Sequence, residues 1–569
     1  MTKKDVIHIL EDIGKLLELT DETPFKSRAY YHAARNIAAT EEDIHTLVSE
    51  GKLSSIKGIG DALNRKITEL VTTGKLEYYE KLKDSIPAGH IEMMKIEGLG
   101  PKKIRTLYKK LKIKTIGELE YACIENRLVE LAGFGKKTQD RILTGIERLK
   151  RYKKRHLYAD IVMEAESLFD FVREQKDVIS MVLAGSIRRR NEVIKDIDIL
   201  ASTENPLKLA DFFVSLPKVR NITAKGKTKV SIVLKSGINA DLRIVTEKEF
   251  PYALHHFTGS KEHNIAMRER AKGMGIKMNE YGLFRGDDII PCESENEIFS
   301  ALGLSFIPPE LRENMGEIEA AERGEIPELV ERKDIRGLLH IHTNASDGSD
   351  SLEAIVKAAK KMGMEYIGIT DHSRSAYYAG GLSIDEIKRQ HATIDEINRR
   401  EDKFHILKGI EADILPDGSL DYDDEILRSF DFVIAAVHSH FRMPEEEMNS
   451  RLIKSLDNKF TTILAHPTGR LLLARDPYSL DLKKIIDFAA KKGKVIELNA
   501  NPHRLDLDWR YCKYAKSRGV KIAINPDAHN ISSLYHIDFG INIARKGWLE
   551  PSDCINCLNL EEMKEFLSH

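Results

Sequence analysis

Cysteine is scarce in this sequence: five cysteines are spread thinly over 569 residues, a pattern atypical of a disulfide framework. Long apolar runs are missing, since none approaches the roughly 20 residues that cross a bilayer. The N-terminus interleaves acidic with apolar residues and lacks the apolar stretch of a signal peptide. An excess of one charge is absent too, because 88 Lys and Arg stand against 90 Asp and Glu. These absences exclude a disulfide-rich secreted protein and a globally basic protein, and they favour a soluble cytoplasmic one.

Charge and histidine are distributed unevenly along the chain. Residues 95–155 hold 18 Lys and Arg against 7 Asp and Glu. Residues 333–569 hold 33 basic and 37 acidic residues, together with 12 of the 20 histidines. The length and the 42% hydrophobic content suit several cores, in about three or four domains. We expect one end of the chain to bind polyanions and the other to bind metals.

Three kinds of periodicity divide the chain. Residues 1–150 have apolar residues at three- and four-residue spacing, which predicts an almost purely helical region. Residues 157–300 follow a helix with short alternating strands, which favours an α+β domain. From Gly337, apolar strands alternate with helical patterns, which predicts a parallel sheet closed or nearly closed into a barrel. The predicted domains are residues 1–85, 86–150, 151–315 and 336–569, with a charged linker at 316–335.

The pattern apolar-x-Gly-apolar-Gly occurs three times in the helical region, at residues 56–60, 96–100 and 131–135, and each copy opens a helix. Two glycines around an apolar residue permit a tight turn whose backbone N–H groups face an anion. Lysines follow the second and third copies, where they can pair with phosphates. The pattern resembles the helix-hairpin-helix motif, which grips the DNA backbone, although ordinary helix corners are the simpler alternative. The candidate DNA-binding residues are Gly58, Gly60, Gly98, Gly100, Lys102, Lys103, Gly133, Gly135, Lys136 and Lys137.

Lys66 lies on the helix that follows the first glycine turn. A lysine with a lowered pKa can form a Schiff base with the aldehyde of an abasic sugar. A solvated surface charge is the alternative interpretation, and the sequence leaves both open.

Two carboxylates, Asp196 and Asp198, occupy alternate positions of one predicted strand and therefore face the same way. Divalent cations relieve the repulsion between such a pair, and Mg²⁺ prefers carboxylate oxygens together with substrate phosphates. Asp241, on another alternating strand, would complete a two-metal site for phosphoryl transfer.

A glycine-serine turn precedes these carboxylates. Gly185 and Ser186 would supply a small hydrogen-bonding turn against the phosphates of a nucleotide, with Arg189 as a cationic clamp. A Gly-Ser turn followed by an Asp-x-Asp strand and a later strand Asp is typical of nucleotidyltransferases. A further cluster of candidate nucleotide-binding residues follows, namely His256, Phe257, Gly259, Asn264 and Arg268.

Residues 1–315 resemble the family X DNA polymerases, the DNA polymerase beta-like enzymes, because these motifs occur in that family's order. The resemblance implies that the three aspartates hold catalytic Mg²⁺ or Mn²⁺ and that Lys66 occupies the position of the lyase nucleophile. It also implies that Phe257 and Gly259 lie against the incoming sugar, Asn264 near its base and Arg268 near the template.

Metal-ligand residues stand at the ends of the predicted strands in the C-terminal region. A barrel gathers the loops after its strands at one mouth, so these side chains are expected to meet. Mixed imidazole and carboxylate ligands suit Zn²⁺, Mn²⁺ or Fe²⁺ and permit up to three ions. The candidate ligands are His340, His342, Asp347, His372, Glu411, His438, His466, Asp527 and His529.

The same region, residues 336–569, resembles the polymerase and histidinol phosphatase (PHP) family of metal-dependent phosphoesterases. That family has these ligand types in this order. The resemblance implies a trinuclear site in a distorted seven-stranded β/α barrel and an active hydrolase.

The two resemblances together imply a repair enzyme that fills short DNA gaps by template-directed dNTP addition and trims 3′ ends as a 3′-5′ exonuclease. We expect the protein to be a monomer. Its expected partners are gapped or nicked DNA and dNTPs, with no membrane. Two alternatives stay open: a template-independent nucleotidyltransferase coupled to a phosphoesterase, and a DNA-binding scaffold in which one catalytic domain is inactive.

Overall fold

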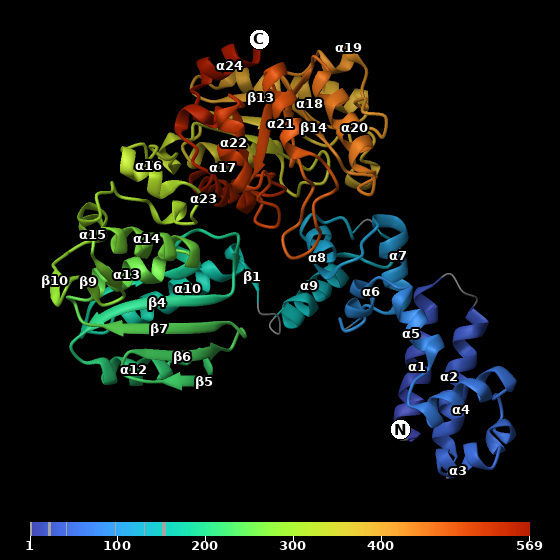
Figure 1. Cartoon of the computed structure of the whole chain (residues 1–569). Helices are drawn as coiled ribbons and strands as arrows, with labels where there is room; N and C mark the ends of the chain where they lie inside the picture. Colours follow the sequence, from blue (N-terminus) through green and yellow to red (C-terminus); the bar gives the residue numbers. More distant parts are fainter. Residues whose placement is uncertain are drawn as a thin grey trace. The chain divides into compact units, whose positions relative to one another are not determined.

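A computed structural model describes residues 3–20, 24–40, 42–96, 98–129, 131–150 and 155–568. Figure 1 shows the chain coloured from the blue N-terminal helices to the red C-terminal strands and helices. The chain divides into two compact units, Met1–Lys150 and Arg151–His569. The predicted start of the third domain falls on residues 151–154, which lie outside the described residues.

All the secondary-structure elements in the described residues of the first unit are helices, which confirms the prediction. One apolar cluster joins α1, α2 and α4 through Leu10, Ile37 and Ile67, and a second joins the helices after Pro87. Thr115 and Glu118 form a capping box that starts α8. The elements are α1 Lys3–Leu19, α2 Pro24–Ala39, α3 Ile44–Ser49, η1 Lys52–Ser55, α4 Asp61–Thr73, α5 Glu77–Asp84, α6 Ala88–Met93, α7 Pro101–Leu111, α8 Ile116–Ile124 and α9 Lys136–Lys150.

The second unit begins with a five-stranded sheet in the order β2-β4-β7-β6-β5. Its central pair, β4 and β7, runs parallel, and the other neighbours are antiparallel. Alternate residues of β6 and β7 are buried against α10 and α12, as the predicted α+β domain requires. The elements are β1 His156–Leu157, α10 Tyr158–Arg173, β2 Val178–Leu183, α11 Gly185–Arg188, β3 Val193–Ile194, β4 Asp196–Thr203, α12 Pro206–Ser215, β5 Val219–Lys225, β6 Lys229–Leu234 and β7 Asn239–Val245.

A smaller helical layer with a three-stranded sheet follows. The segment 316–335, predicted as a linker, contains α16, and its residues Ile318 and Leu329 pack into one buried cluster with Trp548. This charged segment is therefore part of a hydrophobic core. The elements are α13 Phe250–Thr258, α14 Lys261–Gly273, β8 Lys277–Asn279, β9 Gly282–Arg285, β10 Asp288–Ile290, α15 Glu295–Ala301, η2 Pro309–Leu311, α16 Glu317–Arg323 and η3 Arg332–Asp334.

Seven parallel strands in chain order form the predicted barrel. A parallel bridge between Ile341 and Ala528 brings the first and last strands together, so the sheet is nearly closed. All residues of the first, second, fourth, sixth and seventh strands are buried, as expected of a sheet covered on both faces. The strands are β11 Gly337–Ile341, β12 Tyr366–Ile369, β13 His405–Asp413, β14 Phe432–Ala436, β15 Thr461–Leu464, β16 Val495–Asn499 and β17 Ile522–Asn525.

Helices follow most of the barrel strands. In α17 the buried residues Leu352, Ile355, Val356 and Ala359 recur at helical spacing, and Ser351 caps the N-terminus. Within the described ranges, none of the helices has the length and apolarity to traverse a lipid bilayer. The helices are α17 Leu352–Lys361, η4 Tyr377–Ala379, α18 Ile384–Arg400, α19 Asp424–Leu427, α20 Glu445–Asp457, α21 Leu482–Lys492, α22 Trp509–Ser517, η5 Ile531–His536, α23 Ile537–Lys546, η6 Pro551–Asp553, η7 Ile555–Cys557 and α24 Leu560–Ser568.

Candidate active sites and nucleic-acid interface

The register of β4 and β7 pairs two of the predicted carboxylates. Asp198 stands opposite Asp241, and Asp196 stands opposite Asn239. Burial, Asp241 and Asp196 raise the pKa of Asp198 to about 6. Lys229 Nζ lies 2.7 Å from Asp241 Oδ2, and Asn239 Nδ2 donates to Asp196 Oδ1 at 3.3 Å. Because burial and two neighbouring carboxylates disfavour the charged form of Asp198, the carboxylate cluster fits divalent cations, which relieve that repulsion.

The predicted phosphate turn lies directly against this cluster. Gly185 begins α11 with a φ of +60°, and a Cβ built there would stand 2.1 Å from Asp198 Oδ2. Only glycine fits both the backbone angle and this space. Ser186 follows in the first turn of α11, so the turn and the carboxylate form one site.

Arg189, the predicted clamp, directly follows α11. Its Nε donates to Glu313 Oε1 at 2.9 Å, and its Nη1 donates to the Thr258 carbonyl at 2.9 Å. The guanidinium therefore joins the phosphate turn to the end of α13, where the predicted sugar contacts lie.

The residues predicted to select the nucleotide lie on α13 and α14. Asn264 Nδ2 donates to the His256 carbonyl at 2.7 Å, and a Cβ on Gly259 would stand 2.5 Å from Asn264 Oδ1. The guanidinium carbon of Arg243, on β7, lies 4.8 Å from the centroid of the Phe257 ring. Arg268, an exposed residue on α14, donates from Nε to the Asn264 carbonyl. These residues thus form one connected group.

The nine predicted metal ligands of the barrel gather in one buried cluster, and Glu411 lies at its centre. Oxygen Oε1 of Glu411 is 3.3 Å from His340 Nε2, 3.3 Å from His438 Nε2 and 3.2 Å from His466 Nε2. Its Oε2 is 3.0 Å from His372 Nδ1. One carboxylate therefore connects ligands from five strand ends.

Two further carboxylates complete the cluster. Asp347 Oδ2 lies 3.4 Å from His372 Nε2, and its Oδ1 lies 3.3 Å from His529 Nε2. Asp527 Oδ1 lies 3.4 Å from His342 Nε2. Eight of the nine ligands form three overlapping groups compact enough for a metal ion, and His466 joins them through Glu411.

The chemistry of this cluster fits divalent ions. Within the described ranges, buried nitrogens of His340, His342 and His372 and both oxygens of Asp347 have no hydrogen-bond partner. Buried polar atoms are otherwise almost always paired, so these atoms are arranged for a common ligand. The backbone is strained at three ligands, with φ of +58° at His340, +24° at His466 and +50° at Asp527. The fold sustains these conformations where they direct a side chain into the cluster.

Two carboxylates that hydrogen-bond to the metal ligands, Glu497 and Asp413, were not identified from the sequence. Glu497 lies within β16, is fully buried and accepts from His340 Nδ1 at 2.5 Å. Asp413 accepts from His438 Nδ1 at 2.5 Å. Such partners orient the imidazoles and fix which nitrogen faces the metal. The only sequence signal for Glu497 is an acid inside an otherwise apolar strand.

The three glycine turns of the first unit share one geometry. Gly58, Gly98 and Gly133 have φ of +87°, +81° and +89°. In each turn the following apolar residue is buried, and α4, α7 or α9 begins after the second glycine. The predicted lysines fall in the first turns of α7 and α9. Open helix N-termini with nearby lysines suit binding to backbone phosphates.

Lys66, on α4, is held between two tyrosines. Its Nζ donates to Tyr30 Oη at 2.5 Å and lies 3.3 Å from the centroid of the Tyr78 ring. Burial and the nearby Lys26 lower the pKa of Lys66. The solvated surface charge weighed from the sequence does not describe this side chain, because it is part-buried and partnered.

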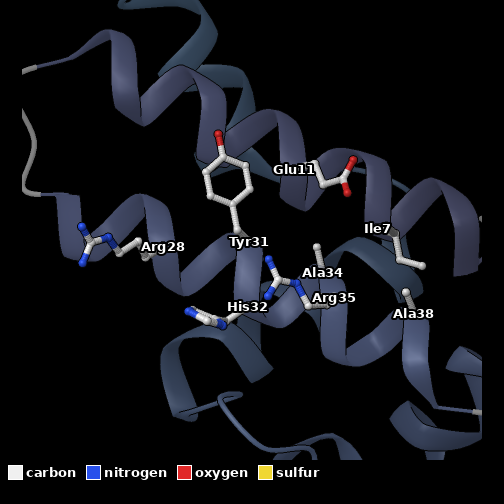
Figure 2. Close-up of a pocket in the computed structure, with 8 residues that line it drawn as sticks. All are labelled: Ile7, Glu11, Arg28, Tyr31, His32, Ala34, Arg35 and Ala38. Atoms are coloured by element: carbon white, nitrogen blue, oxygen red, sulfur yellow. The ribbon is translucent and has the colours of Figure 1, made fainter. Parts of the chain in front are cut away.

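A hollow of about 410 Å³ opens between α1 and α2. Figure 2 shows Arg28, His32 and Arg35 on α2 and Glu11 on α1. Burial and acidic residues of α1 raise the pKa of Tyr31, which also lines the hollow, to about 12. Cations and a carboxylate thus share this hollow, and none of its lining residues belongs to a predicted site.

Glycine turns for a DNA backbone, a carboxylate-bearing nucleotidyltransferase sheet and an imidazole-rich barrel define a metal-dependent enzyme that processes nucleic acid. Family profiles match the helix-hairpin-helix domain at residues 1–76, the SAM-like helix-hairpin-helix tandem at 91–148, the DNA polymerase beta thumb at 253–313 and the PHP domain at 339–501.

The chain resembles curated proteins over its whole length and in parts. The DNA polymerase/3′-5′ exonuclease PolX of Bacillus subtilis is 40% identical over 571 residues, which cover 100% of this chain and 99% of the relative. The repair DNA polymerase X of African swine fever virus is 28% identical over 23% of this chain and 81% of the relative. A probable phosphatase of Caldanaerobacter subterraneus is 26% identical over 42% of this chain and 93% of the relative. The chain belongs to the PolX family, the family X DNA polymerases that carry a PHP domain.

Proposed function

We propose that this chain is a DNA repair polymerase that fills short gaps by template-directed dNTP addition and that also acts as a 3′-5′ exonuclease. The observation that carries the first activity is the pairing of Asp198 with Asp241 beside the Gly185 turn. Full-length similarity to a DNA polymerase/3′-5′ exonuclease supports both activities. The proposed partners are gapped or nicked DNA and dNTPs.

In the proposed polymerase site, the protein mainly positions the reactants. Asp196, Asp198 and Asp241 would hold Mg²⁺ or Mn²⁺, which when bound neutralises charge on the phosphates and stabilises in-line phosphoryl transfer. Ser186 and Arg189 bind the triphosphate in this proposal. Asp241 accepts the hydrogen bond of the primer 3′-hydroxyl, which aligns that oxygen with the α-phosphorus atom.

In the proposed exonuclease site, the nine barrel ligands would hold up to three ions of Zn²⁺, Mn²⁺ or Fe²⁺. Glu411 connects several imidazoles and keeps them at fixed separations. Glu497 and Asp413 accept hydrogen bonds from His340 and His438, which leaves the opposite ring nitrogens to face the centre. The protein thus orients a metal site into which a phosphodiester at a 3′ end can bind.

A third activity is proposed for Lys66. A part-buried lysine with a lowered pKa is a better nucleophile toward the aldehyde of an abasic sugar than a solvated lysine. Tyr30 and Tyr78 hold its amine in place. We therefore propose Lys66 as the lyase nucleophile of the first unit.

The experiment is a denaturing-gel assay on a 5′-labelled primer in gapped duplex DNA with Mn²⁺, run with and without the matched dNTP. The wild-type chain should extend the primer by the matched nucleotide and shorten it when dNTP is omitted. Asp198→Ala should abolish extension and keep shortening, and His340→Ala should do the reverse. Extension by Asp198→Ala, or shortening at the wild-type rate by His340→Ala, would contradict the assignment of that site.

A further inference from the structure

A lysine of the barrel domain is buried beside the polymerase site. Lys546 is the last residue of α23, and its side chain is 1% exposed. Its Nζ lies 2.5 Å from Glu313 Oε1, donates to the Arg189 carbonyl at 3.2 Å and lies 4.7 Å from the centroid of the Trp509 ring. Lysine is almost never fully buried unless it is paired, so this placement needs a reason.

Glu313 connects this lysine to the predicted triphosphate clamp. Its Oε1 accepts from Arg189 Nε at 2.9 Å and from Lys546, so two cations share one carboxylate oxygen. The side chains of Glu313 and Arg189 are only 14% and 12% exposed. Solvent screens such a buried group of charges weakly, so the loss of one charge is felt by the other two.

A second set of contacts links the barrel to the segment that follows Arg189, between α11 and β4. Glu192, three residues after Arg189, lies 3.8 Å from Arg470 Nη2 and 3.5 Å from Arg510 Nη1. Arg470 follows His466 by four residues and donates from Nε to the Arg504 carbonyl. Residues of the barrel therefore contact the loop between the phosphate turn and the Asp196 strand at two places.

We propose that Lys546 is a positioning residue for DNA synthesis: it neutralises Glu313 and thereby leaves the Arg189 guanidinium available to the triphosphate of the incoming dNTP. This inference rests on the proposed polymerase function. It assigns a residue of the exonuclease domain a part in nucleotide binding by the polymerase domain.

The physical argument predicts the effect of removing the lysine charge. Without Lys546, Glu313 would be a buried carboxylate that keeps its hydrogen bond from Arg189 but loses the one from the lysine, so it would hold the guanidinium more tightly. The loss of one positive charge from this group would also weaken its attraction for the triphosphate. Because Arg189 contacts the triphosphate before and during the reaction, the loss should raise KM for dNTP and leave kcat nearly unchanged.

The test measures single-nucleotide insertion on gapped DNA with the full chain. Lys546→Met keeps an unbranched side chain against Trp509 but removes the charge, and KM for dNTP should rise about tenfold with kcat within about twofold. Adding Glu313→Gln to this variant removes the unpaired charge and should return KM to within about threefold of wild type. Shortening of the primer without dNTP should continue in both variants, which shows that the barrel is folded.

Lys513→Met is the matched control. Lys513 also joins the barrel domain to the preceding segment, by donating to the Met315 carbonyl at 3.1 Å, and its Nζ lies 3.6 Å from the centroid of the Trp548 ring. Its removal should leave KM for dNTP unchanged. The inference is overturned if Lys546→Met shortens primers normally and keeps the wild-type KM, if Lys513→Met raises KM equally, or if Glu313→Gln fails to restore it. A wild-type chain that neither binds nor inserts dNTP would overturn the proposed function, and this inference with it.

Discussion

Glu497 offers the sharpest test of how the barrel orients its ligands. This fully buried carboxylate accepts from His340 Nδ1 at 2.5 Å and from the His466 backbone N–H at 2.7 Å. Asn499 and Asn525 donate their amides to the same carboxylate at 3.1 and 2.9 Å. Four donors therefore converge on one side chain, and each oxygen accepts from two of them.

The perturbation is Glu497→Gln, which keeps the size of the side chain but replaces one acceptor oxygen with a donor. Whichever way the amide turns, its NH₂ group meets two donors, and the charge that strengthens the His340 hydrogen bond is lost. Hydrogen bonds to charged groups contribute about 1.5–3 kcal/mol each. Loss of such an outer partner typically costs about 10–100-fold in metal affinity, which corresponds to about 1.4–2.7 kcal/mol.

The assay is a Mn²⁺ titration of primer shortening with metal-stripped protein. Glu497→Gln should need about 10–100-fold more Mn²⁺ for half-maximal shortening, while primer extension keeps its own metal dependence. Glu425→Gln, on the exposed start of α19, is the matched control and should behave as wild type. An unchanged Mn²⁺ requirement in Glu497→Gln would refute the argument that this carboxylate orients the ligands.

Three further predictions concern the other sites. Burial, Asp241 and Asp196 raise the pKa of Asp198 to about 6, so the contribution of Asp198 to the stability of the metal-free protein should be fully present below about pH 4 and be lost as pH rises through about 6. Asp198→Asn should remove that loss, which amounts to at most about 3 kcal/mol, and thermal unfolding of the metal-free variants at pH 4 and pH 8 measures it. Lys66→Ala should abolish borohydride trapping on abasic DNA, and undiminished trapping would exclude Lys66 as the nucleophile. Gly133→Ala, at a φ of +89°, should cost about 1–2 kcal/mol and weaken DNA binding, and equal affinity across a salt titration would contradict a role for this turn.

The candidate ligands could be predicted from the sequence because the geometry of parallel strands is regular. Strand ends meet at one mouth of a barrel, so His340 and Glu411 were expected to be neighbours although 71 positions separate them in the chain numbering. Alternation likewise placed Asp196 and Asp198 on one face of a strand. The regular geometry of strands therefore made it possible to predict which of these side chains lie together at each candidate site.

Contacts between segments without a shared period could not be predicted. The hydrogen bond from Arg189 to Glu313 spans 124 positions and depends on how the loop after η2 returns to the phosphate turn. The composition of residues 316–335 favoured a linker because half of them are charged, yet apolar ones such as Ile318 are buried. Glu497 was missed because an acid in a strand is ordinarily solvent-facing, whereas β16 is covered on both faces.

The contacts of α23 and of Trp548, which follows it, limit where the chain can be divided into fragments that fold. Phe539 packs edge-on to Tyr158 at a ring-centroid separation of 6.2 Å, and Trp548 belongs to the same core as Leu329. A fragment that begins at residue 336 would expose the rings of Phe539 and Trp548 to water. Lys546 would also lose its acidic partner Glu313, so the fragment should aggregate on expression. A split version of the enzyme is better divided near residue 150, between the two compact units, where each half retains its own interior.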